Sequence, residues 1–239
     1  MILPYIDQAP LYNQINFNIN ACCNSGGNPA SPNTNDALLQ NVRISAFLCP
    51  SDSPPSGLPG PNNYAVCLGP NKGWGIGQVD SNGMFSRTWW VGLSDVNDGT
   101  SNTIMASELI TTEQGGAAGT QTELSRFRNG SGLGSGYPNS YPTFTYTDYQ
   151  NWTQACAGVT SINGNRATLL TPNAKFPNCS SHCSGCHPDG PGLWGARSKH
   201  TGGVHVVMGD GAVKFISDNI DWETYQRIGG RNEGLPAGE

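Results

Sequence analysis

The stretch HTGGVHVVMGDGAVKFISDNI, residues 200–220, decides the fold because it joins two apolar segments through a glycine-rich turn. Val204–Met208 and Ala212–Ile216 flank the tripeptide Gly209-Asp210-Gly211. Glycine adopts the positive φ that a tight connection between antiparallel strands requires. The stretch therefore predicts a β-hairpin over 204–216.

The segment that follows the hairpin has the features of a helix with marked ends. Asp218 is placed to cap a helix over 219–228, and Asp221 puts negative charge near its positive end. Gly229-Gly230 then ends the helix. The side chains expected to pack it against the sheet are Trp222, Tyr225 and Ile228.

Shorter sequence patterns elsewhere in the chain predict further strands and helical turns. Tyr64–Leu68 and Thr103–Leu109 predict two more strands. Residues 4–15 carry one apolar helical stripe that Pro10 interrupts, which predicts two short helical turns hinged at Pro10. The aromatic-rich stretch 137–152 fits core packing beneath a long loop, with sugar stacking as the alternative.

The composition limits the fold class. The 239 residues include 32 Gly and 17 Pro, and only 36% are hydrophobic and 12% charged. Gly and Pro serve turns rather than element interiors, which excludes long helical bundles and a doubly wound α/β domain. We therefore expect an α+β fold: an antiparallel sheet, short helices at both ends and long loops. One domain over 1–239, with a loop excursion over about 113–200, fits this length.

The charge and hydropathy of the chain exclude several partners. The net charge is −5, and the 12 Lys and Arg residues are spread thinly, so we expect no nucleic acid partner and no contact with an anionic membrane. No run of 18 apolar residues occurs, so the sequence contains no membrane-spanning segment.

The cysteine count points to an oxidising compartment. The chain has eight cysteines, an even number, in a low-charge sequence typical of exported proteins with disulfides. We therefore expect the long loops to be pinned by disulfides, with a pairing that the sequence leaves open. The cysteines are Cys22, Cys23, Cys49, Cys67, Cys156, Cys179, Cys183 and Cys186.

The cysteines at 179–187 have three interpretations. Disulfides are favoured, because oxidising compartments favour them. Zinc is the second interpretation, with Cys179, His182, Cys183 and Cys186 as the ligands. A c-type haem is the third, because Cys183-x-x-Cys186-His187 has the form of a haem attachment site.

A turn rich in oxygen donors lies at 95–102. Asp95, Asn97 and Asp98 are candidate calcium ligands, since Ca²⁺ prefers six to eight oxygens. The spacing departs from the EF-hand pattern, because Gly99 is the fifth residue from Asp95 rather than the sixth. A cap or turn leading into the strand at Thr103 is the favoured interpretation.

Catalytic signals are weak. The sequence contains no Gly-x-Ser-x-Gly elbow and no phosphate-binding loop. The weak candidates are His200, Asp210 and Glu108, which would belong to a metal-assisted hydrolase of carbohydrates or esters. Five strand residues separate His200 from Asp210 by roughly 17 Å, so their spacing implies no direct bond. The favoured alternatives are an Asx-type turn at Asp210 and a solvated surface position for Glu108.

Four stretches in this order resemble a known family, the prepilin-type His-x9-Asp-Gly family abundant in planctomycetes. They are ILPYIDQAPLYNQINFN at 2–18, FLCPSD at 47–52, NDGTSNTIMASE at 97–108 and the stretch at 200–220. The resemblance implies a pilin-like α+β head behind an N-terminal hydrophobic helix with a cleavage and methylation site. It also implies an extracellular or periplasmic location at the cell surface, and no assigned biochemical function.

The sequence departs from this pattern in one respect, because the hydrophobic prepilin segment is absent. We interpret the sequence as a chain cut to its soluble head. The resemblance then implies a pilin- or pseudopilin-like protein with a structural or adhesive function. Its expected partners are other pilin-like subunits, through the missing helix, and surface carbohydrate.

Overall fold

The protein is described by a computed structural model. Side chains and backbone are described for residues 2–19, 35, 38, 42–53, 61–70, 82–86, 90–111, 170–174, 195–232 and 234, and the strands at 127–129, 178–180 and 192–193 are described as backbone.

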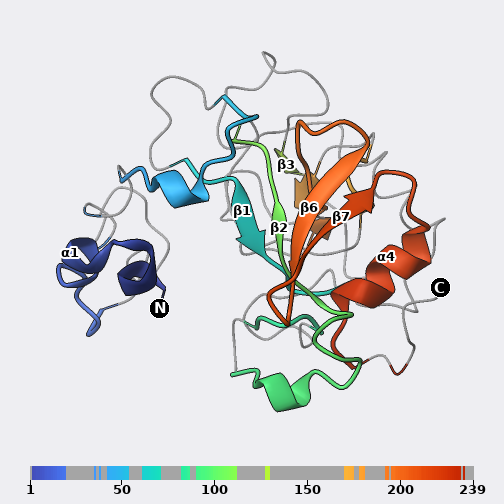
Figure 1. The fold of residues 1–239 in the computed structure, drawn as a ribbon, viewed down its shortest axis with the longest axis horizontal. Coiled ribbons are helices and arrows are strands. Elements are labelled where there is room, and N and C mark those ends of the chain that lie inside the picture. Colours follow the sequence, from blue (N-terminus) through green and yellow to red (C-terminus); the bar gives the residue numbers. More distant parts are fainter. Residues whose placement is uncertain are drawn as a thin grey trace.

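The hairpin predicted from the stretch at 200–220 is confirmed (Figure 1). β6 (Gly203–Met208) pairs antiparallel with β7 (Val213–Ser217). Gly211 has a φ of 88° in the connection, which a side chain would disfavour. Asp210 makes the expected Asx-type turn, because its Oδ1 accepts the backbone N–H of Ala212 at 2.9 Å.

The two other predicted strands complete this sheet. β1 (Tyr64–Val66) pairs antiparallel with β2 (Ile104–Glu108), and β2 pairs antiparallel with β6. The strand order is β1-β2-β6-β7, so segments far apart in sequence lie side by side. This four-stranded antiparallel sheet confirms the main architectural prediction.

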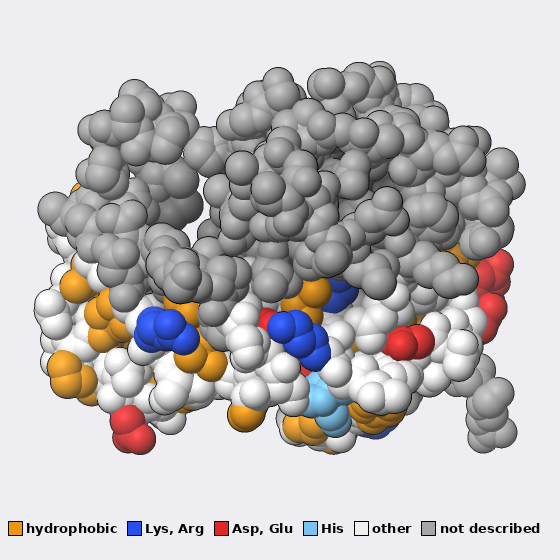
Figure 2. Space-filling model, turned by 90° about the horizontal axis from the view of Figure 1, so that it is seen from above, with side chains coloured by type: hydrophobic (Ala, Val, Ile, Leu, Met, Phe, Trp, Pro, Cys, Tyr) orange, Lys and Arg blue, Asp and Glu red, His pale blue; other side chains and the backbone are white. Residues whose placement is uncertain are grey.

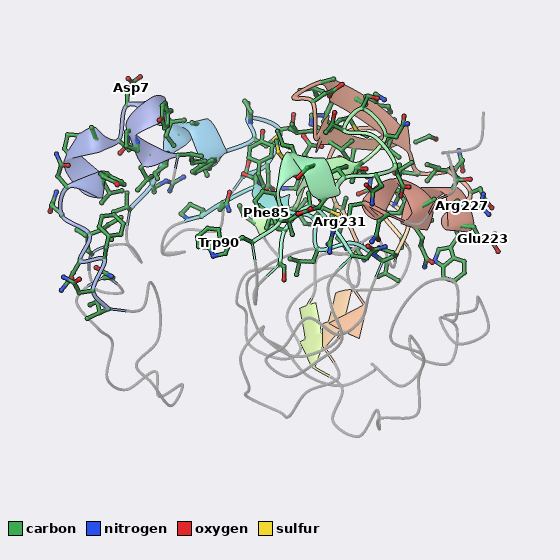
Figure 3. All side chains as sticks on the ribbon, turned by 90° about the horizontal axis from the view of Figure 1, so that it is seen from below. Asp7, Phe85, Trp90, Glu223, Arg227 and Arg231 are labelled. Atoms are coloured by element: carbon green, nitrogen blue, oxygen red, sulfur yellow. The ribbon has the colours of Figure 1, made fainter. Side chains whose placement is uncertain are left out.

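The C-terminal helix is shorter than predicted. α4 (Trp222–Gly229) is capped by Asp221, whose Oδ2 accepts the backbone N–H of Thr224 at 2.9 Å. Asp218, the predicted cap, instead accepts a hydrogen bond from the Asn173 side chain at 2.9 Å. The helix ends one residue later than predicted, at Gly229, with Gly230 as its C-cap. Glu223 and Arg227 pair one turn apart on α4, at 3.7 Å (Figure 3).

The core lies between α4 and one face of the four-stranded sheet. Alternate residues of β6 point into it, as the two-residue period of a strand requires. Tyr225 and Ile228 dock the helix as predicted, whereas Trp222 is only partly buried. The buried cluster consists of Cys67, Ile104, Ala196, Val204, Val206, Met208, Tyr225 and Ile228.

A second, smaller sheet contains a parallel pair. β3 (Phe127–Asn129) runs parallel to β4 (Asn178–Ser180), and β4 pairs antiparallel with β5 (Gly192–Leu193). The prediction of an antiparallel architecture therefore holds for the main sheet and is wrong for β3 and β4. This sheet falls within the stretch at 113–200 that we expected to form a loop excursion.

The N-terminal segment lies apart from the main sheet (Figures 1 and 3). It contains the 3₁₀-helix η1 (Leu3–Ile6) and the single-turn α1 (Ala9–Tyr12). Two short helical turns are confirmed, but the break is at Asp7, which has a φ of 59°, rather than at Pro10. Pro10 lies in the first turn of α1, where a missing N–H costs no helical hydrogen bond.

Two further 3₁₀-helices, η2 (Ser45–Phe47) and η3 (Leu93–Asp95), precede β1 and β2 respectively. Within the described residues, no helix has the length and apolar character needed to cross a membrane. Charged side chains are few and scattered over the described part of the face in Figure 2, consistent with the low charged fraction of 12%.

Candidate functional site

A tight turn positions the first side chain of the candidate site. The backbone N–H of Asp52 donates to the carbonyl of Cys49 at 3.0 Å, which closes a turn over residues 49–52. Pro50 occupies the second position, where its fixed φ suits a β-turn. The turn presents Cys49 at one end and Asp52 at the other.

Asn63 attaches this turn to the sheet. Its Oδ1 accepts the backbone N–H of Cys49 at 2.9 Å, and its Nδ2 donates to Asp52 Oδ2 at 2.7 Å and to the carbonyl of Leu109 at 2.9 Å. Asn63 is 1% exposed, so these hydrogen bonds form away from water, where an unpaired amide would be costly. Asn63 carries no motif in the sequence, and its only signal is its position just before a predicted strand.

Asp52 is a buried carboxylate with strong partners. Lys199 Nζ lies 2.6 Å from its Oδ1, and the backbone N–H and hydroxyl of Thr111 donate to its Oδ2 at 2.7 and 2.6 Å. Burial raises the pKa of Asp52, but the hydrogen bonds from Lys199, Thr111 and Asn63 outweigh it and lower the pKa to about 2. Asp52 therefore remains ionised and fixes Lys199 beside the turn.

His200 follows Lys199 in a loop that has its own hydrogen bonds. The Ser198 hydroxyl donates to the carbonyl of Gly203 at 2.7 Å and accepts the backbone N–H of His200 at 3.1 Å. Asn173 accepts the backbone N–H of Ser198 at 2.9 Å. These contacts hold the loop against the start of β6 and direct His200 toward β2.

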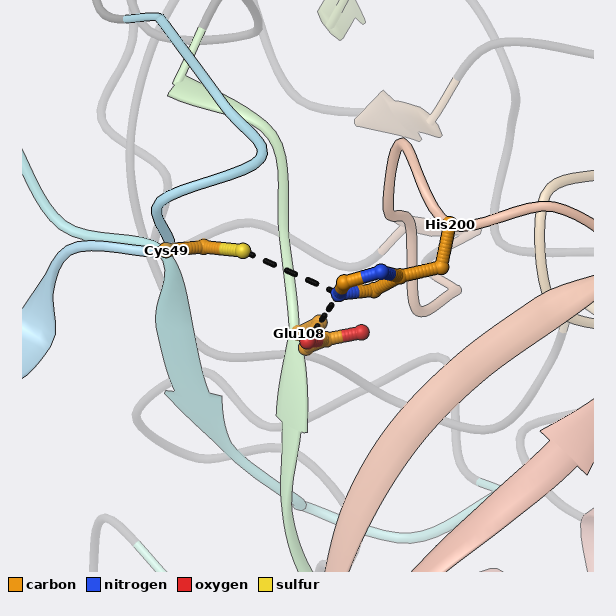
Figure 4. A group of neighbouring side chains, drawn as sticks. All are labelled: Cys49, Glu108 and His200. Atoms are coloured by element: carbon orange, nitrogen blue, oxygen red, sulfur yellow. Dashed lines mark hydrogen bonds and ion pairs between the residues drawn. The ribbon is translucent and has the colours of Figure 1, made fainter.

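Three side chains from distant segments meet at this point (Figure 4). His200 Nε2 lies 3.1 Å from Glu108 Oε1 and 3.7 Å from Cys49 Sγ. The three atoms lie within 4.8 Å of one another. Each side chain comes from a different stretch of the family resemblance: 47–52, 97–108 and 200–220.

Glu108 is the buried centre of this cluster, with its side chain 5% exposed. Its Oε2 accepts the backbone N–H of His205 at 2.8 Å, and its Oε1 lies 3.5 Å from His205 Nδ1. The rings of His200 and His205 meet edge to face, with centroids 4.8 Å apart. The expectation of a solvated surface position for Glu108 is wrong, because β2 places this residue beneath the 198–203 loop.

The geometry is not that of a nucleophile, base and carboxylate relay. In such a relay the thiol and the carboxylate bind different ring nitrogens of the histidine. Here Cys49 and Glu108 both approach the same nitrogen, Nε2 of His200. A neutral ring nitrogen either donates one proton or offers one lone pair, so it does not serve both neighbours fully. The arrangement instead brings together three atoms that are each able to ligate a cation.

Asp210 is separate from this cluster. It stays in the hairpin turn with Ala212, at the other end of β6 from His200. Of the three predicted catalytic candidates, the structure therefore brings together His200 and Glu108, and it adds Cys49, Asp52 and Lys199. The Cys49-Pro50 turn was the sequence signal that could have identified Cys49 and Asp52.

The predicted calcium ligands have separate hydrogen-bonding partners. Asp95 Oδ2 accepts the backbone N–H of Gly92 at 2.8 Å and so caps η3. Asp98 Oδ1 accepts the backbone N–H of Gly234 at 3.0 Å. The Asp95 contact is a helix cap, whereas the Asp98 contact joins this segment to the C-terminal part of the chain, and Asn97 lies between the two aspartates in the chain.

Two cysteines bear on the disulfide prediction. Cys49 and Cys67 are free thiols, so the prediction of disulfides is wrong for these two residues. Cys67 lies in the core, where burial raises the pKa of its thiol to about 12. The thiol and histidine side chains of the proposed zinc and haem sites, Cys179, His182, Cys183, Cys186 and His187, lie outside the described residues.

A groove runs along the sheet face opposite α4, with a volume of about 480 Å³. The register pairs His205 with Phe215 and Val207 with Val213 on this face. Val213 is 66% and Phe215 49% exposed. Glu108 and His205 line the groove as well, so the Cys49–Glu108–His200 cluster lies at its edge.

A family model, SBP_bac_10, described as "Protein of unknown function (DUF1559)", matches residues 1–223. No curated protein and no solved structure matches the chain.

Proposed function

We propose, from the premise that this chain belongs to the DUF1559 family, that it is the head of an exported, pilin- or pseudopilin-like subunit of a cell-surface assembly. The family predicted from four sequence stretches corresponds to this one. The pilin-like character and the surface location in this proposal are inferred from the family resemblance of the sequence. The proposed activity is assembly with like subunits.

The observation that carries this proposal is the apolar N-terminal segment. Residues 2–19 lie apart from the main sheet and expose four large side chains. Burying a side chain of this size contributes about 1.5–3 kcal/mol, so a protein contact that covers them would be stabilised substantially. The four are Ile2, Tyr5, Phe17 and Ile19, with exposed fractions of 57%, 87%, 53% and 39%.

The uncovered sheet face supports the same proposal. Val213 lines its apolar groove, Phe215 lies two residues further along β7, and both side chains are exposed. An antiparallel sheet commonly packs one face on its core and leaves the other to solvent, but solvent-facing positions are then mostly polar. Apolar residues on this face suit a contact with another protein surface.

The test is site-specific photocrosslinking of the full-length gene product in cells that export it. Tyr5→p-benzoylphenylalanine places the probe in the N-terminal segment, and Leu93→p-benzoylphenylalanine is the matched control, since Leu93 is 68% exposed on η3. We expect light-dependent oligomers of this chain for the Tyr5 probe, in the envelope or surface fraction, and none for the Leu93 probe.

Two results would contradict the proposal. One is a cytoplasmic product that forms no oligomers with either probe. The other is equal crosslinking from Tyr5 and Leu93, which would indicate collision rather than a defined contact.

A further inference from the structure

We propose that Cys49, Glu108 and His200 form a zinc site, with Sγ, Oε1 and Nε2 as three protein ligands and a fourth position open to water. This goes beyond the assembly role and does not depend on it. A monomeric chain would bind zinc in the same way.

Two of the three distances between the ligand atoms are close to those of a tetrahedral site, and the third, between Cys49 Sγ and Glu108 Oε1, is within 4.8 Å. Zinc binds sulfur at about 2.3 Å and nitrogen or oxygen at about 2.0–2.2 Å. Tetrahedral angles then place sulfur and nitrogen ligands about 3.6 Å apart, and nitrogen and oxygen ligands about 3.4 Å apart. The structure has 3.7 Å between Cys49 Sγ and His200 Nε2, and 3.1 Å between His200 Nε2 and Glu108 Oε1.

The donor set selects the metal. A thiolate and an imidazole are poor ligands for Ca²⁺ and Mg²⁺, which prefer oxygen. Sulfur, nitrogen and carboxylate oxygen together suit Zn²⁺. Three protein ligands with an open fourth position is the pattern of sites that exchange a water for another ligand.

Each ligand residue is positioned by a hydrogen bond made through an atom other than the ligating one. Glu108 uses Oε2 for the His205 backbone, which leaves Oε1 for the metal. Asn63 fixes the backbone of Cys49 at 2.9 Å, and Ser198 fixes that of His200 at 3.1 Å. Such supporting contacts orient metal ligands and raise affinity.

The accessibility of the cluster also suits a metal ion. The Cys49 residue is partly buried, the His200 side chain is 27% exposed and the Glu108 side chain is 5% exposed. An ion can therefore enter from the His200 side and be held against the buried carboxylate. The alternative to a metal site is a set of hydrogen bonds in which His200 Nε2 faces both Cys49 Sγ and Glu108 Oε1.

The test is titration of the reduced full chain with Zn²⁺ by calorimetry, and with Co²⁺ by absorbance. Cobalt bound through Cys49 should give a thiolate charge-transfer band and the intense visible bands of a tetrahedral site. We expect C49S and H200Q to lose this band and one equivalent of zinc, with binding weakened more than about 100-fold, since even supporting residues contribute 10–100-fold. E108Q, which keeps the side-chain size, should weaken binding as well.

Two matched controls make the assignment specific. H205Q alters the neighbouring ring but keeps the backbone N–H that Glu108 Oε2 accepts, so it should weaken binding by no more than about tenfold, the low end for a supporting residue. The variant C179S/C183S/C186S removes the competing cysteine cluster and should keep the cobalt band. Circular dichroism and cooperative urea unfolding confirm that each variant is folded.

Several results would overturn the proposal. These are a wild-type chain that binds no zinc, C49S or H200Q variants that bind as the wild type does, and a band lost in C179S/C183S/C186S but kept in C49S. A loss in H205Q as large as that in H200Q would also overturn this ligand set.

Discussion

Glu108 Oε1 lies 3.1 Å from His200 Nε2 although the two residues are 92 positions apart in the chain. The other oxygen of Glu108 accepts the backbone N–H of His205 at 2.8 Å. A single buried carboxylate on β2 therefore anchors both the 198–203 loop and the start of β6.

Removing this carboxylate should destabilise the fold. We expect Glu108→Ala to lower the free energy of unfolding by about 2–3 kcal/mol, because it leaves the His205 N–H without its acceptor. Glu108→Gln should lower it by about half as much, because the amide oxygen still accepts that hydrogen bond. Urea denaturation of both variants measures the difference, and equal losses would contradict the role given to Oε2.

Because of Asp52, the free energy of unfolding should fall as the pH is lowered into the acid range. The pKa of Asp52 in the folded protein is about 2, below the ordinary value of 3.8, so ionised Asp52 stabilises the fold above pH 4. This contribution, roughly 2 kcal/mol, is lost as the pH falls through about 2. Urea unfolding should therefore show a gap between wild type and Asp52→Asn at pH 7 that narrows near pH 2. A gap independent of pH would contradict this.

The two described thiols should differ in reactivity. Cys67 is 2% exposed and burial raises its pKa to about 12, so almost no reactive thiolate forms near neutral pH. Cys49 is only partly buried and should be alkylated by iodoacetamide in the native, metal-free protein. Peptide mass spectrometry identifies the labelled cysteine, and denatured protein labelled at both is the control. Faster native labelling of Cys67 would show that the core around it opens.

Gln226 is a position where an apolar residue should stabilise the protein. Its side chain is fully buried in α4, and neither Nε2 nor Oε1 has a partner among the residues that the structure describes. Burying an unpaired amide costs about 1–3 kcal/mol, so Gln226→Met, of similar size, should raise the unfolding free energy by about 1 kcal/mol. A lower melting temperature for this variant would indicate that the amide is hydrogen-bonded, for example to a buried water.

The sequence predicts well those parts of the fold that rest on local chemistry. The β6–β7 hairpin depends on two apolar runs and a glycine turn, which are adjacent in the chain, and its strands form as expected. The start of α4 was predicted wrongly, because Asp221 rather than the predicted Asp218 caps the helix. Asn173, about 45 positions away from Asp218, binds it and leaves Asp221 to cap the helix. A local pattern does not contain that contact.

The candidate site shows the same limit. His200 and Glu108 were identified separately, but their meeting depends on the order β1-β2-β6-β7 and on the register that aligns Tyr64 with Glu108. Cys49 was assigned to a disulfide because an even count of cysteines favours pairing. Only the position of the Cys49–Asp52 turn against β2, held through Asn63, identifies it as a neighbour of His200.

The contact between Cys49 and His200 joins residues 151 positions apart, which has a consequence for the order of folding. Closing a chain loop of that length costs entropy before any contact compensates for it, so native pairs with large sequence separation slow folding. The β6–β7 hairpin can nucleate locally, whereas this contact requires the sheet between the two loops. Proximity of Cys49 to His200 is therefore a marker of a chain that has completed folding.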